Sequence, residues 1–388
     1  MLEWLIVGGG IHGTYFANLL IRQAEVPPDK IAILDPHDGL LAAWYRMTAN
    51  CGMQFLRSPA THQIDIPILS LYRFAKSPIG RSSAAFIPPY NRPSLDLFNA
   101  HSAHVIAAND LAARHLVGRA LALRRDGPAL AVETSRGLLR TRRTLLAIGL
   151  SEQPYWPSWA WNLKRHDGPI AHVFDPDFKR RGETANDRTV VVGGGITAVQ
   201  TALALSARPG SQVVLLVRRP LKESQFDFNP CWIGPKCLRD FYRQGPAARR
   251  ESIDGARIPG SLPAEVLEDF KRALDQARLA FRQAAIRTAA VEGDGIRLVT
   301  ENGVEHARRV ILATGLRPER PGGALTERLA EEWGLPSNHC GYPIVGEDLQ
   351  WGPDVYVTGP LAELQIGPCA RNIVGARNAG RQLLASLD

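Results

Sequence analysis

Two stretches of this chain share one design: Val7-Gly8-Gly9-Gly10-Ile11-His12-Gly13 and Val192-Gly193-Gly194-Gly195-Ile196-Thr197-Ala198. Each follows an apolar run typical of a buried β-strand and leads into a helical pattern. At such a turn glycine lets the backbone approach a pyrophosphate, and the positive N-terminal end of the next helix faces that anion. A turn that merely joins a strand to a helix is the simpler alternative. The repeated context favours two dinucleotide sites.

The charge that ends the next strand differs between the two copies. The strand 31–34 ends in Asp35, whereas the strand 213–217 ends in Arg218 and Arg219. A carboxylate suits the free ribose hydroxyls of FAD or NAD, and guanidinium groups suit a 2′-phosphate. A solvated strand end is the alternative for the two arginines. We therefore expect FAD at the first site, on Gly8, Gly10, Gly13 and Asp35, and NADPH at the second, on Gly193, Gly195, Ala198, Arg218 and Arg219.

The repetition extends beyond the glycine turns. Residues 121–137 and 291–303 both have the pattern of short antiparallel strands joined at Asp-Gly and Asn-Gly turns, and each leads to a buried strand that stops at Gly149 or Gly315. The sequence therefore predicts an α/β fold with two Rossmann-like dinucleotide-binding domains, the second inserted into the first. We expect an FAD domain from 1–155 plus 316–388 and an NADPH domain at 156–315.

Composition narrows the class of protein. The 388 residues are 45% hydrophobic and 22% charged, without an apolar run long enough to cross a bilayer, so we expect a cytoplasmic protein with no membrane contact. The net charge of +8 comes from scattered arginines, which argues against a nucleic-acid surface. Cys231 and Cys237 are the closest of five cysteines, and we expect them to serve in packing. No histidine or cysteine spacing suggests a metal site.

Two further segments have recognisable patterns. Residues 261–290 carry apolar residues at helical spacing, which predicts one amphipathic helix. The stretch 154–161 is rich in proline and tryptophan, which favours an interdomain linker, with a cleft lining as the alternative.

Four segments together resemble the flavin-containing monooxygenases, particularly the branch that N-hydroxylates ornithine or lysine. Residues 166–176 resemble the motif FxGxxxHxxxP, with His166 at the first position and His172 at the conserved histidine. Residues 312–321 resemble LATGY-x4-P, with Leu316 in place of tyrosine. Residues 50–57 are similar to the segment where these enzymes place Met-Gln beside the flavin and a lysine in the substrate pocket. Residues 228–242 resemble the run that contains their nicotinamide- and substrate-contacting asparagine.

The resemblance implies an enzyme in which NADPH reduces FAD, and the reduced flavin traps O2 as a C4a-(hydro)peroxide that oxygenates an amine nitrogen or a sulfur. The substrate would be a small molecule, and because related enzymes are often dimers or tetramers, a homo-oligomer is a further expectation. No side-chain nucleophile is needed, but water must be excluded.

The resemblance also implies roles for individual residues. Arg57, Gln54 and Asn229 would act on the substrate side, although a surface position is the alternative for Arg57. Near the flavin, core packing is the alternative for Trp44 and Met53, and His172 would be a structural histidine between the domains. The expected flavin contacts are Trp44, Met53, Gln54, Gly359, Ile366 and Gly367.

Two other functions stay open from the residues alone. One is an FAD-dependent NAD(P)H oxidoreductase that passes electrons to a quinone or a partner protein. A disulfide substrate is disfavoured because no CxxC or CxxxxC pair is present. The other is a non-catalytic dinucleotide sensor, which the intact glycines of both turns do not exclude.

Overall fold

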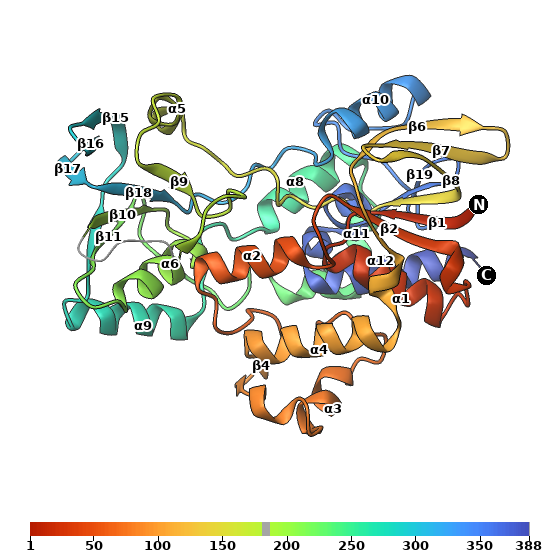
Figure 1. Cartoon of the computed structure of the whole chain (residues 1–388), viewed down its shortest axis with the longest axis horizontal. Helices are drawn as coiled ribbons and strands as arrows, with labels where there is room; N and C mark the ends of the chain where they lie inside the picture. The colour runs from red at the N-terminus through yellow and green to blue at the C-terminus, as the bar shows by residue number, and fades with distance from the viewer. Residues whose placement is uncertain (181–186, 388) are drawn as a thin grey trace.

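The computed structural model describes residues 1–180 and 187–387. Figure 1 shows two α/β lobes side by side, each built on its own parallel sheet. We call the lobe that holds both chain ends the first lobe and the other the second lobe.

The first lobe is a sheet with the strand order β19-β20-β8-β1-β2-β5. Its central strand β1 (Leu2–Val7) pairs in parallel with β2 (Ile31–Asp35) and β8 (Gly137–Leu146). The C-terminal strand β20 (Val355–Val357) pairs in parallel with β8, so the chain returns to complete its first sheet. The other strands are β3 (Phe86–Ile87), β4 (Arg92–Pro93), β5 (His115–Val117), β6 (Ala120–Asp126), β7 (Ala129–Thr134) and β19 (Gln350–Gly352).

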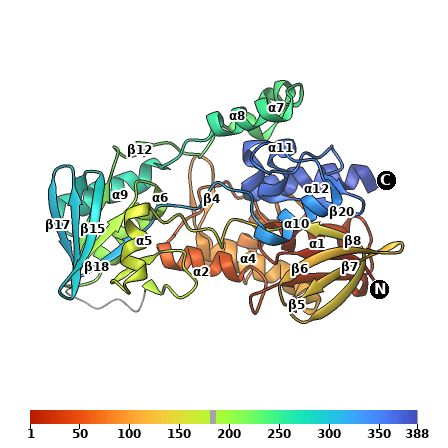
Figure 2. The ribbon, with the colours of Figure 1, turned by 90° about the horizontal axis from the view of Figure 1, so that it is seen from above.

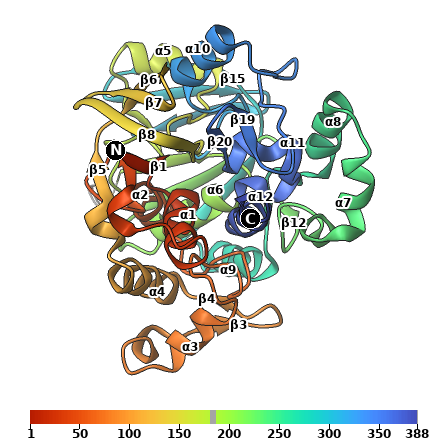
Figure 3. The ribbon, with the colours of Figure 1, turned by 90° about the vertical axis from the view of Figure 1, so that its right-hand side faces the viewer.

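The helices of the first lobe come from two parts of the chain, one before and one after the second lobe in the sequence. The α-helices of the lobe are α1 (Ile11–Arg22), α2 (Ala42–Cys51), α3 (Ser70–Lys76), α4 (Leu95–Ala108), α10 (Gly323–Trp333), α11 (Glu363–Ile366) and α12 (Ile373–Leu387). The short 3-10 helices are η1 (Pro28–Lys30), η2 (Arg81–Ser83), η3 (Leu111–Arg114), η6 (Gly359–Ala362) and η7 (Pro368–Arg371). Figure 3 shows α3, β3 and β4 set apart from the two sheets.

The second lobe repeats the design with the order β14-β11-β10-β18-β9. Its central strand β10 (Arg188–Val192) is parallel to β11 (Gln212–Val217) and β18 (Arg309–Leu312). The other elements are β9 (Ile170–His172), β12 (Lys222–Glu223), β13 (Ser261–Leu262), β14 (Leu279–Gln283), β15 (Ile286–Glu292), β16 (Gly295–Thr300), β17 (Gly303–Ala307), α5 (Ser158–Arg165), α6 (Ile196–Ser206) and α9 (Ala264–Asp275). The predicted class, two Rossmann-like units in one α/β chain, is confirmed.

The predicted strand repeats are also present. In the first lobe β6, β7 and β8 form an antiparallel series, and in the second lobe β15, β16 and β17 do the same. The copies differ in one respect: β8 continues directly into the parallel sheet, whereas Arg308 separates β17 from β18. The domain boundaries at 155 and 316 stay a prediction.

A bridging segment, residues 222–262, leaves the second lobe and packs on the first. It contains η5 (Pro230–Ile233), α7 (Pro235–Tyr242) and α8 (Pro246–Ala256). Figure 2 shows α7 and α8 lying over α11 and α12. Leu238 and Phe241 of α7 share a small buried cluster with Leu364 of α11, which attaches the segment to the first lobe.

The prediction of one helix over 261–290 was wrong. The helix α9 ends at Asp275, and Ala277 takes a positive φ of 53° that stops helical hydrogen bonding. The chain then forms β14, whose Phe281 packs edge-on against Phe270 of α9. The position of Phe281 fits the apolar spacing of a helix and also that of a strand, so periodicity alone did not distinguish a helix from a strand here.

The proline- and tryptophan-rich stretch is packed. Trp156 is buried against His172 and the α5 residue Trp161. This agrees with a packed connection rather than a cleft lining. Over the described part of the chain, no helix is both long and apolar enough to cross a membrane.

Candidate functional site

The first glycine turn leaves no space for side chains at two of its positions. A Cβ on Gly8 would lie 2.5 Å from the Ala147 carbonyl oxygen, and one on Gly13 would lie 1.8 Å from the Gly8 carbonyl oxygen. A Cβ on Gly10, the N-cap of α1, would meet no heavy atom within 4 Å. The backbone at the start of α1 therefore faces open space, as an approaching anion requires.

Asp35 lies against this turn. Its Oδ2 accepts a hydrogen bond from the Gly9 amide at 2.6 Å, and its Oδ1 accepts from the His37 amide at 2.9 Å. The His37 ring also contacts Oδ1, through Nδ1 at 2.7 Å, so Oδ2 is the oxygen that keeps a further lone pair to which a ribose hydroxyl could donate. The structure brings Asp35 to the turn as expected, and its ribose role stays a prediction.

His12 connects the turn to the C-terminal part of the chain, a role that sequence analysis missed. Its Nε2 lies 3.1 Å from the Asn372 carbonyl oxygen, so this nitrogen donates, and Nδ1 accepts from Thr358 Oγ1 at 2.9 Å. Burial lowers the pKa of His12 to about 4, which keeps the ring neutral. The available signal was a polar side chain within a turn otherwise made of glycine and isoleucine.

Gly359, Ile366 and Gly367 follow in the same region. Gly359 has a φ of 65°, and a Cβ there would lie 3.7 Å from the His12 ring. Ile366 is buried, and Gly367 has a φ of 83° with a Cβ position 3.1 Å from Leu238. Only the backbone of this pair can therefore face a ligand, which fits the predicted flavin contact without testing it.

The second glycine turn has the same internal geometry. A Cβ on Gly193 would lie 2.3 Å from the Ala313 carbonyl oxygen, and Ala198 is fully buried in the core of the lobe. The Cβ position of Gly195, however, lies 3.6 Å from the Cα of Gly260, so the bridging segment borders this turn.

Arg218 and Arg219 stand exposed just beyond β11. Neither side chain has a hydrogen bond or ion pair with any described residue. Two free guanidinium groups beside the turn suit a phosphate, although a solvated strand end has the same appearance.

The residues expected at the flavin face have two different surroundings. Trp44 donates from Nε1 to Asn99 Oδ1 at 3.0 Å and packs on Phe98, so packing against α4 explains it. Gln54 is exposed and, with Met53, lines a cleft of about 770 Å³ that also borders the C-terminal end of α6. Because α6 is about 16 Å long, this cleft lies at the opposite end of the helix from Gly195.

Arg57 is held by the bridging segment. Its Nε donates to the Gln225 carbonyl at 2.8 Å, and its Nη2 donates to the Ser224 carbonyl at 2.7 Å and to Ser261 Oγ at 2.8 Å. A longer contact of 3.4 Å joins Nη1 to the Ser261 carbonyl. Four of its five N–H groups are therefore occupied by protein acceptors, which leaves little for a substrate.

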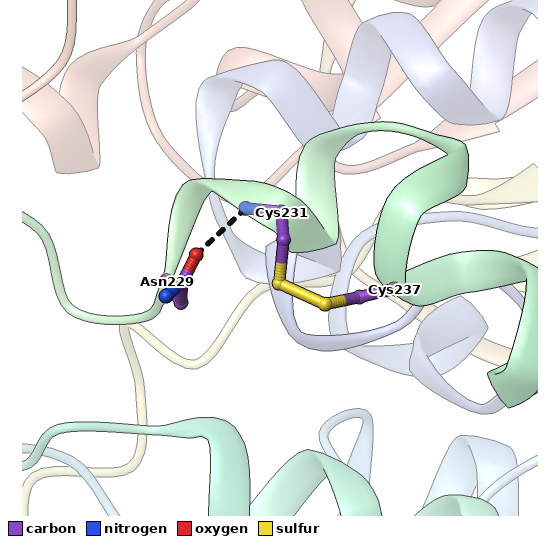
Figure 4. Close-up of a disulfide and its surroundings, with 3 residues drawn as sticks. All are labelled: Asn229, Cys231 and Cys237. Atoms are coloured by element: carbon purple, nitrogen blue, oxygen red, sulfur yellow. Dashed lines mark hydrogen bonds between the residues drawn. A yellow bond between two sulfur atoms is a disulfide. The ribbon is translucent and has the colours of Figure 1, made fainter.

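Asn229 caps a turn instead of facing a cleft. It is exposed, and its Oδ1 accepts from the Cys231 amide at 3.0 Å (Figure 4). The structure thus does not bring the three predicted catalytic side chains together: Gln54 lines the cleft by α6, Arg57 holds the bridging segment and Asn229 lies at the surface.

The packing role expected for two cysteines was wrong. Cys231 and Cys237 form a disulfide with a Cα–Cα distance of 5.3 Å (Figure 4). The tight turn η5 and the start of α7 at Pro235 fold the intervening residues back, so that two cysteines six positions apart meet. Spacing alone did not reveal this because it requires that turn.

Comparison with known proteins found structural matches only: no protein-family model and no curated sequence matches the chain. Ornithine hydroxylase PvdA from Pseudomonas aeruginosa matches with a TM-score of 0.75 and 19% identity over 100% of this chain and 98% of that one. Ornithine N-hydroxylase KtzI from Kutzneria sp. 744, described with reduced FAD, NADP+ and L-ornithine, matches with a TM-score of 0.77 and 16% identity over 100% and 99%. The chain has the fold of these flavin-dependent N-hydroxylases.

The same fold also occurs in a reductase. Bacillithiol disulfide reductase from Staphylococcus aureus matches with a TM-score of 0.63 and 14% identity over 99% of this chain and 97% of that one. The fold therefore does not select the reaction by itself.

Proposed function

We propose that this chain is an FAD- and NADPH-dependent monooxygenase that transfers one oxygen atom from O2 to the nitrogen of a small amine. The observation that carries the proposal is the pair of glycine turns with opposite charge at the end of the following strand, in a chain that matches N-hydroxylases from end to end.

The first site fits FAD. Gly10 leaves open space at the positive end of α1, Asp35 offers carboxylate oxygens, and His12 joins the turn to Thr358, one residue before Gly359. The second site fits NADPH, since Arg218 and Arg219 are exposed and have no hydrogen bond or ion pair with residues 1–180 and 187–387. The flavin would supply the redox and oxygen chemistry when bound.

The protein's own residues would hold the segments around the two nucleotide sites in place and keep water out of the space between them. The neutral His12 ring holds the start of α12 against the first glycine turn through Asn372. Arg57 holds the bridging segment over the second turn, where Gly260 lies next to Gly195. Bringing these segments together would exclude water from the space between the two nucleotide sites.

The test starts with the purified protein reconstituted with FAD. With O2, NADPH and a series of ornithine, lysine, putrescine and cadaverine, we expect NADPH oxidation coupled to a hydroxylamine product detected by mass spectrometry. Arg218→Gln with Arg219→Gln should raise the KM for NADPH about tenfold or more and leave the KM for NADH unchanged, while Arg142→Gln, an exposed substitution on β8, should change neither. Peroxide release without hydroxylated product across amines and thioethers would contradict the proposal.

One observation favours a second candidate, an NADPH-dependent reductase. The Cys231–Cys237 disulfide lies in a loop that contacts the C-terminal helix, because Asn378 Nδ2 donates to the Ile233 carbonyl at 3.2 Å. A hydride from NADPH, passed through FAD as two electrons and one proton, together with one proton from solvent, would convert this disulfide to two thiols and leave NADP+. Anaerobic NADPH should then produce two new thiols per chain in a thiol assay, and none in a Cys231→Ser/Cys237→Ser variant.

A further inference from the structure

An ion pair at the surface joins two strand ends of the first sheet. Arg119 follows β5, and its Nη1 and Nη2 donate to the two carboxylate oxygens of Glu152, at 2.8 Å and 2.6 Å. Glu152 lies beyond β8, in the connection that leads to the second lobe. Because each nitrogen has its own oxygen, the pairing is bidentate and holds the guanidinium plane in a fixed orientation. The hydrogen bond from Arg119 lowers the pKa of Glu152, so the carboxylate is charged near neutral pH.

The strand order places this pair across the carboxyl-terminal edge of the sheet. In the order β8-β1-β2-β5, two strands separate β8 from β5, which corresponds to about 14 Å at about 4.8 Å per strand. All four strands are parallel, and their register sets side by side the residues Val7, Leu34, Leu116 and Leu146. The pair therefore spans the ends of β1 and β2, where the first glycine turn and Asp35 lie. In open α/β sheets this edge is where ligands bind.

The neighbouring charges show which end of the nucleotide site the pair covers. Asp35 interacts electrostatically with Arg119, and both Asp35 and His37 interact electrostatically with Glu152. His37 Nδ1 lies 2.7 Å from Asp35 Oδ1, so these four side chains form one group. Asp35 is the expected partner of the ribose hydroxyls, and that ribose carries the adenine. The pair therefore lies at the adenosine end of the first site.

Both ends of the pair are anchored through the backbone. The Arg119 amide donates to Ser135 Oγ at 3.0 Å. Next to Glu152, the Gln153 carbonyl accepts from the Arg317 amide at 2.7 Å. The two side chains can thus separate while their backbones stay in place.

A solvated surface ion pair is the simpler explanation of this contact. The side chains of Arg119 and Glu152 are 52% and 51% exposed, and exposed pairs contribute little to stability. Arg124 and Glu133 form an ordinary pair of this kind, at 2.8 Å, between the adjacent strands β6 and β7. The Arg119 pair differs because it joins strands that are not neighbours and lies beside Asp35. A guanidinium plane held at its edge also keeps its faces for stacking on an aromatic ring.

We propose that Arg119 and Glu152 form a clasp over the adenosine end of FAD. Arg119 stacks on the adenine, and Glu152 is a positioning residue that holds the guanidinium plane. The clasp opens when FAD enters and slows its release once closed. The inference rests on the FAD site of the function proposed above.

NADPH is a second source of the same adenosine chemistry. Its 2′-phosphate would meet the carboxylate of Asp35 at this site, and like charges placed together are unfavourable. This favours FAD as the occupant, and the test includes both nucleotides.

The test uses ligands that differ at the adenosine end. FAD and ADP contain adenosine, whereas FMN does not. Fluorescence titration of the apoprotein gives the dissociation constants of FAD and FMN, and calorimetry gives that of ADP. Release of FAD from the loaded protein is followed after dilution by the recovery of flavin fluorescence, and the KM for NADPH is measured in parallel. Arg124→Gln, which breaks the exposed pair of β6 and β7, is the matched control.

Arg119→Gln should bind FAD and ADP about fivefold more weakly and release FAD about fivefold faster, because the stacked cation is lost. Binding of FMN and the KM for NADPH should stay unchanged. Glu152→Gln should accelerate FAD release by a smaller factor. Because the two residues act as one unit, the double variant should release FAD no faster than Arg119→Gln. Added salt should accelerate FAD release from the wild type more than from Glu152→Gln.

Several outcomes would overturn the clasp while the proposed function stands. One is FAD release from Arg119→Gln at the rate of the wild type and Arg124→Gln. Another is equal weakening of FAD and FMN, which would mean a general loosening of the lobe. A raised KM for NADPH with unchanged FAD release would assign Arg119 to the other nucleotide.

Failure of the proposed function has a different signature. A wild-type protein that retains FAD and yields only peroxide would contradict the oxygenase and leave the release measurements decisive for the clasp. A wild-type protein without affinity for FAD would contradict both.

Discussion

Single backbone positions decide what the first glycine turn can hold. Gly13 has no room for a Cβ because the Gly8 carbonyl would lie 1.8 Å away, whereas Gly10 has open space in front of it. Gly13 therefore allows close packing between the turn and α1, whereas the backbone at Gly10 is free to contact a ligand.

We expect Gly10→Ala to fold normally and to bind FAD at least tenfold more weakly. The added methyl group meets no protein atom, but it projects into the space proposed for the pyrophosphate. Thermal unfolding of the apoprotein and fluorescence titration with FAD measure the two effects. Gly245→Ala, whose Cβ is equally unhindered, is the control, and an unchanged FAD affinity in Gly10→Ala would place the flavin elsewhere.

His172 predicts a pH dependence of stability. The ring is fully buried and its Nδ1 accepts from the Phe174 amide, and burial lowers its pKa from 6.5 to about 4. Above pH 6.5 both the folded and the unfolded state are neutral at this residue. Between pH 6.5 and about 4 the unfolded state binds a proton that the folded state does not, so the free energy of unfolding falls as the pH falls.

His172→Gln should reduce the slope of the free energy of unfolding against pH by the contribution of about one proton. Denaturant unfolding from pH 7.5 to pH 4.5 gives the slope of the free energy of unfolding, to which one histidine contributes up to about 1.4 kcal/mol per pH unit. His166→Gln, at an exposed position, should leave the slope unchanged. Equal slopes in the wild type and His172→Gln would mean that His172 is protonated in the folded state.

At the scale of elements, the bridging segment depends on few contacts. Its η5–α7 part is attached by the apolar cluster around Phe241 and is closed internally by the Cys231–Cys237 disulfide. A cross-link over such a short loop stabilises mainly by limiting the unfolded chain, by about 2 kcal/mol in the loop-entropy model.

Cys231→Ser with Cys237→Ser should therefore loosen this part locally. Hydrogen exchange of residues 230–242 is expected to accelerate, while exchange in the central strands β1 and β10 stays unchanged. A Cys51→Ser variant, at a buried free cysteine, controls for the loss of a sulfur elsewhere. Uniform acceleration across both sheets would show that the disulfide supports the whole fold instead.

At the scale of the whole molecule, Arg57 ties the two lobes together. It follows α2 of the first lobe and donates to Ser224 and Ser261 at either end of the bridging segment. Because Gly260 lies beside the second glycine turn, the geometry of the nucleotide site depends on a residue of the other lobe.

Arg57→Gln should lower the free energy of unfolding by about 2 kcal/mol, since hydrogen bonds to a charged donor are lost. It should also accelerate hydrogen exchange near residues 224 and 261 and raise the KM for NADPH. Arg142→Gln again serves as the matched control. A variant with unchanged exchange and a raised KM only for the amine would instead support the substrate contact suggested by the family resemblance.

Much of the fold followed from local patterns. The glycine turns, the flanking apolar strands and the repeated antiparallel strands are short-range features, and all of them occur as expected. The apolar pattern gave a wrong prediction at Phe281, whose position fits both helical and strand spacing. Pairing of β14 with β11 in the tertiary structure decided that this segment is a strand.

The candidate site was less accessible to sequence analysis. Asp35 lies at its turn because strand, turn and helix are consecutive in the chain. Arg57, Asn229 and Gln54 were chosen by resemblance, and their roles on the substrate side stay a prediction. The partners of Arg57 could not be read from the sequence because Ser224 and Gln225 lie far from it in the chain. His12 escaped attention because its partners, Thr358 and Asn372, lie more than three hundred residues away in the chain.

The sequence by itself therefore determined the architecture and the two nucleotide turns, because these depend on backbone conformation and burial over a few tens of residues. Only the tertiary structure decided which charged side chains are already paired and which retain unpaired donors. That distinction depends on the folded-back bridging segment and on α11, which bring together charges that the sequence keeps apart. Arg57 is an example, because four of its five N–H groups are bound to protein acceptors of the bridging segment.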